Sequence, residues 1–501
     1  MISIKFLVRY SYLMRINDHP ILSFDRGKKV TFLFNGKKID AYENETVASA
    51  LTAAGINVLS RSIKYNRPRG FFCGIGKCSS CLMTVDGVPN VKTCVTPVKN
   101  GMVVESQDGK GNLPENKELK SKKETLHADV AVVGAGPAGL SAAICASRYG
   151  ANVVLIDENQ VAGGQLIKQT HKFFGSKAHK AGVRGIEIAK LLLNEIENSN
   201  VNLLLNAGVI GYYKKIPKEF SCKQETRSFL CNKENGHMLA VVQDSKSIKV
   251  YPKKIIVATG ASENMLAFPG NDLPGVVGAG GVQTLMNVYG VRPGNNVLMV
   301  GAGNVGLIVS YQLMQAGINV KMVVEAMPKI GGYIVHAAKL RRLGVPILTS
   351  HTVKNAYGNG RVEGAKIVKL ENWKEVKGSE FSLDVDLICL AVGLAPTCEL
   401  LFQAGCETKY VPELGGWVAW HDRNLETSIH GIYVAGDCSG IEEASTAMME
   451  GRIAGMDAAE KLGFRIDEKE KKGAFENLNT LRSGPFGEKP RVGKEQIWGR
   501  K

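Results

Sequence analysis

Short apolar runs alternate with polar turns in the first hundred residues. Val30–Phe34 is an apolar, β-branched run, Asn35-Gly36 is a favoured two-residue hairpin turn, and Ile39–Tyr42 returns as a second strand. Thr46–Ala54 then has helical character, with Asn44 or Thr46 as its cap and Gly55 as its stop. Strand, hairpin, helix and a following cysteine-bearing loop predict a small domain of the β-grasp ferredoxin type.

From residue 129 the pattern changes to buried strands that alternate with helices. A strand at Asp129–Val133, a helix at Pro137–Tyr149 and a strand at Asn152–Ile156 predict one βαβ half-unit. A second such unit begins with a strand at Asn296–Val300. We therefore expect an α/β fold with two Rossmann-like dinucleotide-binding domains, one inserted into the other, preceded by the ferredoxin-like domain.

The expected boundaries follow composition. Between about residues 106 and 128 the chain is rich in Lys, Glu, Asn, Gly and Ser, which is typical of a solvated linker. The predicted parts are a ferredoxin-like domain at 14–105, a linker at 106–128, a discontinuous first nucleotide domain at 129–284 and 386–465, an NAD-type domain at 285–385, and a charged tail at 466–501.

The balance of charge is basic, with 63 Lys and Arg against 47 Asp and Glu, for a net charge of +16. The basic residues are spread along the chain and form no nucleic-acid-binding motif, so we expect no nucleic-acid partner. Long uncharged stretches at Val130–Ser147, Leu273–Val291 and Gly294–Val320 are broken by Gly, Pro, Asn and Gln, which argues against a membrane span. Met1–Leu13 is a poor signal peptide, and we expect a cytoplasmic protein.

Four of the 11 cysteines are clustered. Cys73, Cys78 and Cys81 have the spacing C-x4-C-x2-C, and Cys94 follows after twelve further residues. Plant-type [2Fe–2S] domains begin with this triplet, and the glycines of Gly74-Ile75-Gly76-Lys77 let backbone N–H groups approach the sulfurs. Structural zinc and a metal-free set are the alternatives, but a zinc ribbon needs two C-x2-C pairs. The pattern favours a [2Fe–2S] cluster as the metal site.

A glycine fingerprint follows the first α/β strand, at Gly134-Ala135-Gly136-Pro137-Ala138-Gly139. Such a turn exposes backbone N–H groups and a helix N-terminus to a pyrophosphate. Asp157, followed by Glu158, ends the next strand, where a carboxylate meets ribose hydroxyls. Gly163-Gly164-Gln165 supplies another close backbone approach. The alternative is that these glycines only pack the strand on the helix.

The fingerprint is repeated at Gly301-Ala302-Gly303-Asn304-Val305-Gly306, with Glu325 at the corresponding strand end. A carboxylate there would pair with a free ribose 2′-hydroxyl and repel a 2′-phosphate, so a nicotinamide dinucleotide at this site should be NAD rather than NADP. A nucleotide domain that persists only as a scaffold is the alternative.

These motifs, with Ala258-Thr259-Gly260, Ala391-Val392-Gly393 and the late Gly436-Asp437, resemble the two-dinucleotide-domain flavoprotein disulfide reductase fold. The resemblance implies FAD on the first unit, with Asp437 touching the ribityl chain. No C-x-x-C or C-x4-C pair lies in either nucleotide domain, so disulfide reduction is not expected.

Residues 15–464 resemble the α subunits of heteromeric sarcosine oxidase and of related proline, hydroxyproline and opine dehydrogenases. The resemblance rests on Ser62–Gly70 before the cysteine cluster and on Gly436–Arg452. It implies a catalytic β-type flavoprotein subunit, further small subunits, an FMN between subunits, and NAD or another nucleotide in the second site. The first site in family members can hold a nucleotide other than FAD. The C-terminal folate-handling domain and the second cysteine cluster of some relatives have no counterpart after Phe464, so folate-dependent demethylation is not expected.

No catalytic residue is assigned, because the sequence has no Ser/His/Asp arrangement and no His-rich site. His336 could face a flavin or pack in the core. The sequence predicts the electron-transfer subunit of an amine or imino-acid dehydrogenase, which relays electrons from a partner flavoprotein to an external acceptor. A stand-alone NADH:acceptor oxidoreductase with FAD and [2Fe–2S] is the first alternative, and a nucleotide-binding scaffold is the second.

Overall fold

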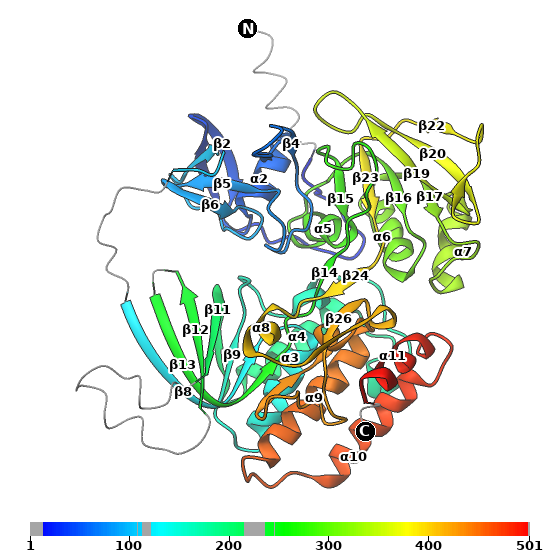
Figure 1. Ribbon diagram of the computed structural model, residues 1–501. Helices are drawn as coiled ribbons and strands as arrows, with labels where there is room; N and C mark the ends of the chain where they lie inside the picture. Colours follow the sequence, from blue (N-terminus) through cyan, green and yellow to red (C-terminus); the bar gives the residue numbers. More distant parts are fainter. Residues whose placement is uncertain (1–13, 108, 113–121, 215–235, 245, 499–501) are drawn as a thin grey trace. The chain divides into compact units, whose positions relative to one another are not determined.

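The computed structural model describes residues 14–107, 109–112, 122–214, 236–244 and 246–498 (Figure 1). The chain divides into two compact units. The first contains Met1–Glu118 and Glu263–Gly393, and the second contains Leu119–Ser262 and Leu394–Lys501. The chain passes between them through the short strands β14 (Ala261–Glu263) and β24 (Leu394–Pro396).

The N-terminal part of the first unit is a five-stranded sheet with one helix. Its strand order is β2-β1-β7-β5-β6. The elements are β1 (Lys29–Phe34), β2 (Lys37–Tyr42), α2 (Val47–Ala53), β5 (Leu82–Val85), β6 (Val88–Lys92) and β7 (Val103–Ser106), and the small pair β3 (Ser60–Arg61) and β4 (Pro68–Arg69) lies beside them. Asn35 (φ 48°) and Gly36 (φ 75°) both adopt positive φ, as the predicted hairpin turn requires. Thr46 caps α2, and its hydroxyl accepts a hydrogen bond from the Ser49 N–H.

The rest of the first unit is a parallel sheet with a smaller antiparallel sheet attached. The parallel order is β15-β23-β16-β17-β18. Its elements are β15 (Val276–Gly278), α5 (Ala279–Gln283), the π-helix η4 (Thr284–Val288), β16 (Asn296–Val300), α6 (Asn304–Gln315), β17 (Asn319–Glu325), α7 (Ile334–Arg342), β18 (Ile347–Thr349) and β23 (Leu387–Leu390). The antiparallel strands are β19 (His351–Tyr357), β20 (Gly364–Glu371), β21 (Lys374–Glu375) and β22 (Phe381–Leu383).

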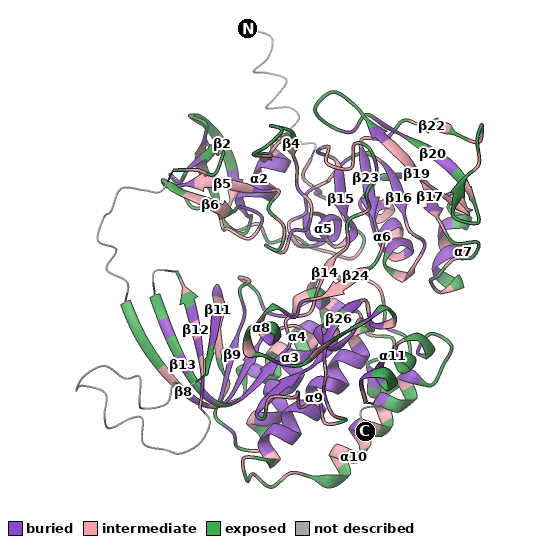
Figure 2. Cartoon of the chain, in the orientation of Figure 1, coloured by how far each residue is buried: buried purple, intermediate pink, exposed green. Residues whose placement is uncertain are grey.

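One hydrophobic core runs through both parts of the first unit. It joins Phe32, Leu51 and Met83 of the ferredoxin-like part to Leu285 and Met299 of the nucleotide-binding part. Figure 2 shows the buried strands of the parallel sheet in purple. Because the apolar side chains form a single cluster, the ferredoxin-like domain and the second nucleotide-binding domain stabilise each other.

The second unit is built on a seven-stranded sheet. The order is β10-β9-β8-β13-β12-β11, and β27 pairs with β13. The strands are β8 (Lys122–Val133), β9 (Val153–Ile156), β10 (Asn202–Leu204), β11 (Ala207–Lys214), β12 (His237–Gln243), β13 (Lys246–Val257) and β27 (Ile432–Val434), with the separate pair β25 (Thr408–Val411) and β26 (Gly416–Ala419). The helices are α3 (Pro137–Arg148), α4 (Gly185–Glu197), α8 (Glu399–Ala404) and α9 (Ala444–Glu460), with the short 3₁₀ turns η1 (Gly164–Lys168), η2 (Lys177–His179), η5 (Pro412–Leu414) and η6 (Gly436–Ser439).

Three features differ from the sequence-based expectation. Residues 263–284 and 386–393, expected in the first nucleotide domain, belong to the first unit. Residues 122–128, expected in a linker, form the first half of β8 and pair in parallel with 246–252 of β13. The expected charged tail forms two helices, α10 (Glu468–Arg482) and α11 (Glu488–Trp498). In the last two cases many charged side chains hid a regular element, because the strand is largely exposed and the helices bury only Arg482 and Lys494 in ion pairs.

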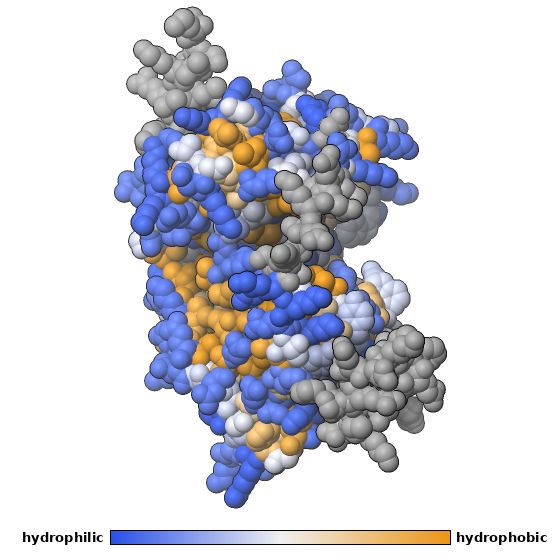
Figure 3. All heavy atoms as spheres, turned by 90° about the vertical axis from the view of Figure 1, so that its left-hand side faces the viewer, coloured by the Kyte–Doolittle hydropathy of each residue, from blue (hydrophilic) through white to orange (hydrophobic). Residues whose placement is uncertain are grey.

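On the face drawn in Figure 3, hydrophobic side chains form one broad area near the middle of the view and smaller patches elsewhere, with hydrophilic side chains around them. No helix in the described part of the chain combines the length and the apolar character needed to cross a membrane.

Candidate functional site

The four clustered cysteines come together from two loops. Cys73, Cys78 and Cys81 lie between β4 and β5, and Cys94 lies between β6 and β7. The thiols of Cys78 and Cys94 donate hydrogen bonds to Cys73, which holds the pKa of Cys73 well below its ordinary value. Cys94 also contacts Cys81 and lowers the pKa of that thiol. No three His, Cys, Asp or Glu side chains of the described residues form a group that could hold a single metal ion. The four thiols are instead neighbours of one another, and four neighbouring cysteines suit two irons with two protein sulfurs each.

Backbone N–H groups of the loop converge on the sulfurs. The Cys78 N–H donates to Cys73 Sγ over 3.5 Å. Further backbone hydrogen bonds run from Ile75 to Cys73, from Ser80 to Cys78, and from Cys94 to Cys81. N–H groups aimed at thiolates stabilise the negative charge of an iron–sulfur cluster and help set its potential. The loop therefore fits a [2Fe–2S] cluster.

Two glycines make this loop geometry accessible. Gly74 (φ +64°) and Gly76 (φ +69°) lie in the left-handed region, which glycine adopts readily. A Cβ on Gly74 would also lie 3.0 Å from Thr284 of η4. The close approach shows that the cysteine loop packs directly against the helical segment α5–η4 of the nucleotide-binding part.

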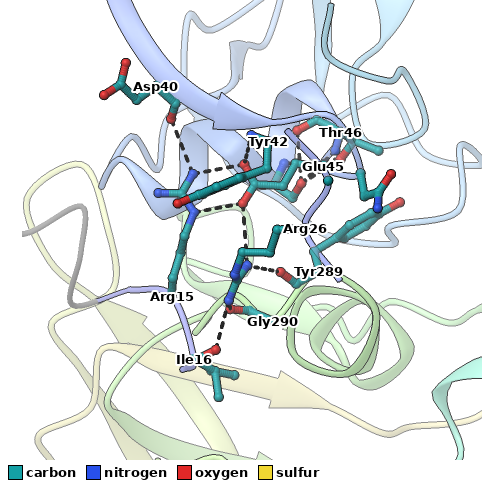
Figure 4. A network of polar contacts seen from close by, with 12 residues as sticks. Arg15, Ile16, Arg26, Asp40, Tyr42, Glu45, Thr46, Tyr289 and Gly290 are labelled. Carbon is teal, nitrogen blue, oxygen red and sulfur yellow. Dashed lines mark hydrogen bonds and ion pairs between the residues drawn. The ribbon is translucent and has the colours of Figure 1, made fainter. Parts of the chain in front are cut away.

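Polar contacts fix the ferredoxin-like part to that same segment (Figure 4). The guanidinium of Arg26 donates to the carbonyls of Tyr289 (2.9 Å) and Gly290 (3.2 Å). Arg15 forms a bidentate ion pair with the buried Glu45, at 2.8 and 2.9 Å. Burial raises the pKa of Tyr289 to about 12, with the nearby Cys94 thiol contributing to the rise. The phenol of Tyr289 therefore stays neutral near the cysteine cluster.

The first glycine fingerprint forms a tight turn between β8 and α3. A Cβ on Gly134 (φ +104°) would lie 2.3 Å from the Ala258 carbonyl, and a Cβ on Gly139 would lie 1.7 Å from the Gly134 carbonyl. Gly136 differs, because its φ of −79° suits any residue and a Cβ there would meet only Gly164, at 4.0 Å. Gly136 is the N-cap of α3 and provides no side-chain cap. The open space and the uncapped helix N-terminus fit a pyrophosphate.

Asp157 braces this turn. One carboxylate oxygen accepts a 2.6 Å hydrogen bond from the Ala135 N–H, and the other accepts a 2.8 Å bond from the Asn159 N–H. The neighbouring Glu158 is exposed. The contacts of Asp157 and Glu158 with a ribose stay predictions.

The second glycine fingerprint forms a similar tight turn between β16 and α6 of the first unit. A Cβ on Gly301 (φ +106°) would lie 2.3 Å from the Ala391 carbonyl, and a Cβ on Gly306 would lie 2.1 Å from the Gly301 carbonyl. Gly303, the N-cap of α6, has nothing within 4 Å of a Cβ position. Glu325 accepts from the Ala302 N–H (2.8 Å), as Asp157 does from Ala135. The second loop thus keeps the geometry of a dinucleotide site.

The sequence also predicts that Gly164, Gln165, Thr259 and Gly260 lie near the first turn. A Cβ on Gly164 (φ +52°) would lie 2.7 Å from Gly136 Cα, so Gly163-Gly164-Gln165 does approach the fingerprint. The Thr259 hydroxyl donates to the Thr397 carbonyl (2.7 Å), and the Gly260 carbonyl accepts from the Thr397 N–H (2.9 Å). His336 is buried on α7, and burial lowers its pKa.

Asp437, which the sequence predicts at the flavin, is buried in a short 3₁₀ turn. It follows β27, in η6, and burial raises its pKa to about 7 while the Glu442 N–H opposes the shift. The preceding Gly436 N–H donates to Glu450 (2.8 Å), and the Ser439 hydroxyl donates to the same carboxylate oxygen (2.6 Å). The loop that carries Asp437 is therefore held in place by Glu450 of α9.

The C-terminal helices supply the cations that pair with Glu442 and Glu450. These cations were not identified from the sequence as part of the site. Arg482 of α10 pairs with Glu442 and with Glu450 (2.6 Å). Lys494 of α11 is fully buried and donates to Ser439 Oγ (2.7 Å) and Glu450 Oε1 (2.9 Å). The buried apolar spacing of Ala474 and Leu478 on α10 was the signal that could have revealed a packed helix.

The other described cysteines are buried and structural. The Cys398 thiol donates to the carbonyls of Trp417 and Cys438, both at 3.3 Å. The Cys438 thiol donates to the Val257 carbonyl at 3.2 Å, and burial raises its pKa to about 11. Neutral, hydrogen-bonded thiols are poor redox groups. Cys222 and Cys231 lie outside the described residues.

Residues 128–451 match the pyridine nucleotide-disulphide oxidoreductase family, and residues 27–109 match the 2Fe-2S iron-sulfur cluster binding domain. The chain belongs to the pyridine nucleotide-disulphide oxidoreductase family. It therefore combines an FAD-type oxidoreductase fold with an N-terminal [2Fe–2S] domain, which confirms the fold and the cofactor types expected from the sequence.

Three known proteins are similar to most of the chain. The chain is 27% identical over 464 residues to the alpha subunit of sarcosine oxidase from Corynebacterium sp. (strain P-1), covering 91% of this chain and 46% of the relative. It is 28% identical over 346 residues to an opine oxidase subunit of Agrobacterium tumefaciens (strain Ach5), covering 66% and 65%. The crystal structure of L-proline dehydrogenase from P. horikoshii has a TM-score of 0.68 and 25% identity, covering 92% and 79%. The chain spans about half the length of the sarcosine oxidase relative.

Proposed function

We propose that the chain is the electron-transfer subunit of a multisubunit amine or imino-acid dehydrogenase. A β-type flavoprotein subunit oxidises the substrate, and this chain relays the electrons to an external acceptor. The observation that carries the proposal is the shared core of the ferredoxin-like and second nucleotide-binding parts, combined with the lack of a reactive cysteine pair among the described residues. The names of the relatives, two of them subunits, support the same class.

The proposal gives each candidate site residue a role. Cys73, Cys78, Cys81 and Cys94 hold the [2Fe–2S] cluster, whose negative charge the loop N–H groups stabilise. For FAD, the first turn (Gly134 to Gly139) binds the pyrophosphate, and Asp157, Glu158, Gly164, Gln165, Thr259, Gly260, Gly436 and Asp437 complete the site. When bound, the flavin exchanges electron pairs and the cluster passes single electrons.

The second turn is proposed to hold NAD or another nucleotide. Gly301 and Gly306 allow the tight turn, Gly303 leaves open space beside it, and Glu325 lies at the expected strand end. An FMN between subunits, further small subunits and a cytoplasmic location complete the proposal, all on the similarity to the relatives. The intact second turn also favours, as a second candidate, a stand-alone NADH:acceptor oxidoreductase.

The test is purification of the tagged full chain from its own cells under native conditions. Co-purifying chains are identified, and dye reduction is measured with NADH and with a panel of imino and N-methyl amino acids. We expect a second flavoprotein and activity that depends on the amine and not on NADH. A lone chain that reduces dye with NADH would replace the subunit proposal by the NADH oxidoreductase.

A cysteine variant distinguishes electron transfer through the cluster from reduction of the partner flavin by substrate. In the purified complex, Cys78→Ser should abolish dye reduction while the partner flavin is still reduced by substrate. Dye reduction that survives the change would show that electrons leave by another route. Cys406→Ser is the matched control, because the Cys406 thiol is buried beside the Thr427 hydroxyl (3.4 Å), far along the chain from the cysteine loop.

A further inference from the structure

The β3–β4 hairpin beside the cysteine loop has a fixed shape. The Ser62 N–H donates to the Arg67 carbonyl (2.9 Å), and the Asn66 N–H donates to the Ser62 carbonyl (2.8 Å). At its base a Cβ on Gly70 would lie 2.8 Å from Pro274 Cα, so the hairpin packs firmly on the nucleotide-binding part of its own unit. Its tip is therefore a rigid projection rather than a loose loop.

The hairpin is tied to the cysteine loop. The Ser60 hydroxyl donates to the Ser80 carbonyl over 2.8 Å, and Ser80 lies between Cys78 and Cys81. Gly70, at the other end of the hairpin, leads directly into Cys73. A protein bound at the hairpin would therefore lie close to the cluster-binding loop.

The tip exposes apolar side chains that the fold does not need. Ile63 is 66% exposed and Tyr65 is 63% exposed. The Tyr65 ring is flanked by two cations, with Lys64 Nζ 5.2 Å and Arg67 Cζ 4.9 Å from its centroid. A rigid aromatic anchor set among basic groups is typical of a surface that recognises another protein.

The charge of the hairpin is strongly positive. Residues 60–70 contain Arg61, Lys64, Arg67 and Arg69 and no acidic residue. Asp272 balances part of this charge, at 2.9 Å from Arg69 and 3.4 Å from Arg67. Beside it lies a hollow of 360 Å³ lined by Arg67, Asp272 and Tyr357, among others. The chemistry favours a partner that presents carboxylates.

We propose that the Ser60–Arg69 hairpin is the docking site of a one-electron carrier protein with an acidic surface patch. The inference deepens the proposed function, since it rests on the cluster as the exit for electrons. One electron leaves the reduced cluster and one enters the carrier, with no bond change and no proton transfer. A small apolar tip ringed by charge matches transient electron-transfer complexes, whereas permanent subunit interfaces are larger and more hydrophobic.

The test uses the full chain with its cluster reduced chemically, so that neither the amine nor NADH is needed. Flavodoxin is the acidic one-electron probe and cytochrome c the basic one, and stopped-flow absorbance gives the second-order rate constants at several ionic strengths. Binding of oxidised flavodoxin to the oxidised chain, followed by flavin fluorescence, gives a second readout that is independent of electron transfer. Wild-type protein should reduce flavodoxin faster at low salt, because opposite charges steer association.

The variants are Lys64→Gln combined with Arg67→Gln, and Tyr65→Ala. The charge variant should slow flavodoxin reduction about tenfold at low salt and flatten its salt dependence. Tyr65→Ala should weaken flavodoxin binding while keeping the salt dependence. The matched control, Lys37→Gln with Lys38→Gln, removes two exposed charges from β2, at the opposite edge of the same sheet from β6, and should change neither readout.

The proposal is overturned if the charge variant and the control reduce and bind flavodoxin equally well. It is also overturned if cytochrome c is the faster acceptor and the hairpin variants slow it. If only the proposed function is wrong, the result differs from both of these outcomes. A chain that oxidises NADH on its own would still show the hairpin-dependent preference for the acidic carrier.

Discussion

The ammonium group of Lys494 donates a 2.7 Å hydrogen bond to the hydroxyl of Ser439, and neither side chain is exposed. Lys494 lies on the last helix, and Ser439 closes the loop that carries Asp437. Lys494 also pairs with Glu450, which in turn accepts from the Gly436 N–H. The C-terminal helices thus hold the predicted flavin loop in position.

Replacing Lys494→Met should destabilise the second unit. The change leaves Glu450 buried with only Arg482 as a cationic partner, and breaking a buried ion pair costs about 3–5 kcal/mol in the free energy of unfolding. Three of the four tryptophans, Trp417, Trp420 and Trp498, belong to this unit, so urea unfolding followed by tryptophan fluorescence reports on it.

Lys489→Met is the control, because Lys489 is exposed on the same helix. Its effect should stay within about 0.5 kcal/mol. Equal destabilisation by the two variants would mean that the buried pair contributes nothing beyond helix composition.

Asp437 should make stability depend on pH. Its pKa is raised from the ordinary aspartate value of 3.8 to about 7, mainly by burial. The folded chain therefore keeps a proton that the unfolded chain releases, and stability falls as pH rises from about 4 to about 7. Asp437→Asn removes this loss. The stability of the variant relative to wild type should rise between pH 4.5 and 7.5, as measured by urea unfolding of nucleotide-free protein.

Asp244→Asn provides the comparison for that experiment. Asp244 is exposed in the turn after β12, with a φ of 49° that asparagine tolerates. The stability of this variant relative to wild type should not vary over the same pH range. A constant difference for both variants would show that Asp437 ionises normally.

Cys73→Ser should remove the iron–sulfur chromophore. Cys73 accepts hydrogen bonds from two of the other thiols and is central to the cluster of sulfurs. Iron and acid-labile sulfide should fall well below two of each per chain, with loss of the visible absorption bands and of the electron paramagnetic resonance signal after reduction. Zinc in place of iron in the wild-type chain would contradict the assignment.

Gly136→Ala and Gly303→Ala should separate the two nucleotide sites. Each Cβ fits the backbone φ and meets no protein atom closer than 4.0 Å, so both variants should fold normally. Each methyl group fills the space that a pyrophosphate would take. Gly136→Ala should lose bound flavin and keep binding of NAD to the second site, and Gly303→Ala should do the reverse.

Each of these glycine variants controls for the other. Flavin content is measured by absorbance after denaturation, and NAD binding by calorimetry. Retention of flavin by Gly136→Ala would show that the first turn does not hold the pyrophosphate.

Local signals made much of the fold predictable. Asn35-Gly36 and Thr46 act through their own backbone and neighbours, and the structure confirms the predicted turn and cap. The glycines at 134, 139, 301 and 306 are dictated by close backbone contacts that recur wherever such turns occur. These features depend on short stretches of chain, which is why the sequence pattern indicates them.

The features that escaped prediction depend on partners distant in sequence. Lys494 and Arg482 look like solvated charges until Glu450 and Glu442 are placed beside them. The exposed first half of β8 has no apolar alternation, and only its pairing with β13 makes it a strand. Nucleotide binding by the described site residues stays a prediction, which the glycine variants test.

The contact between Gly281 and Phe72 has a consequence for how the molecule can be taken apart. A Cβ on Gly281 would lie 2.0 Å from the Phe72 carbonyl, so helix α5 touches the backbone just before Cys73. Separating residues 14–106 from α5 would leave this contact and the apolar core around it open to water. The iron–sulfur domain therefore cannot be transferred to another protein without exposing an apolar surface that α5 and its neighbours cover here.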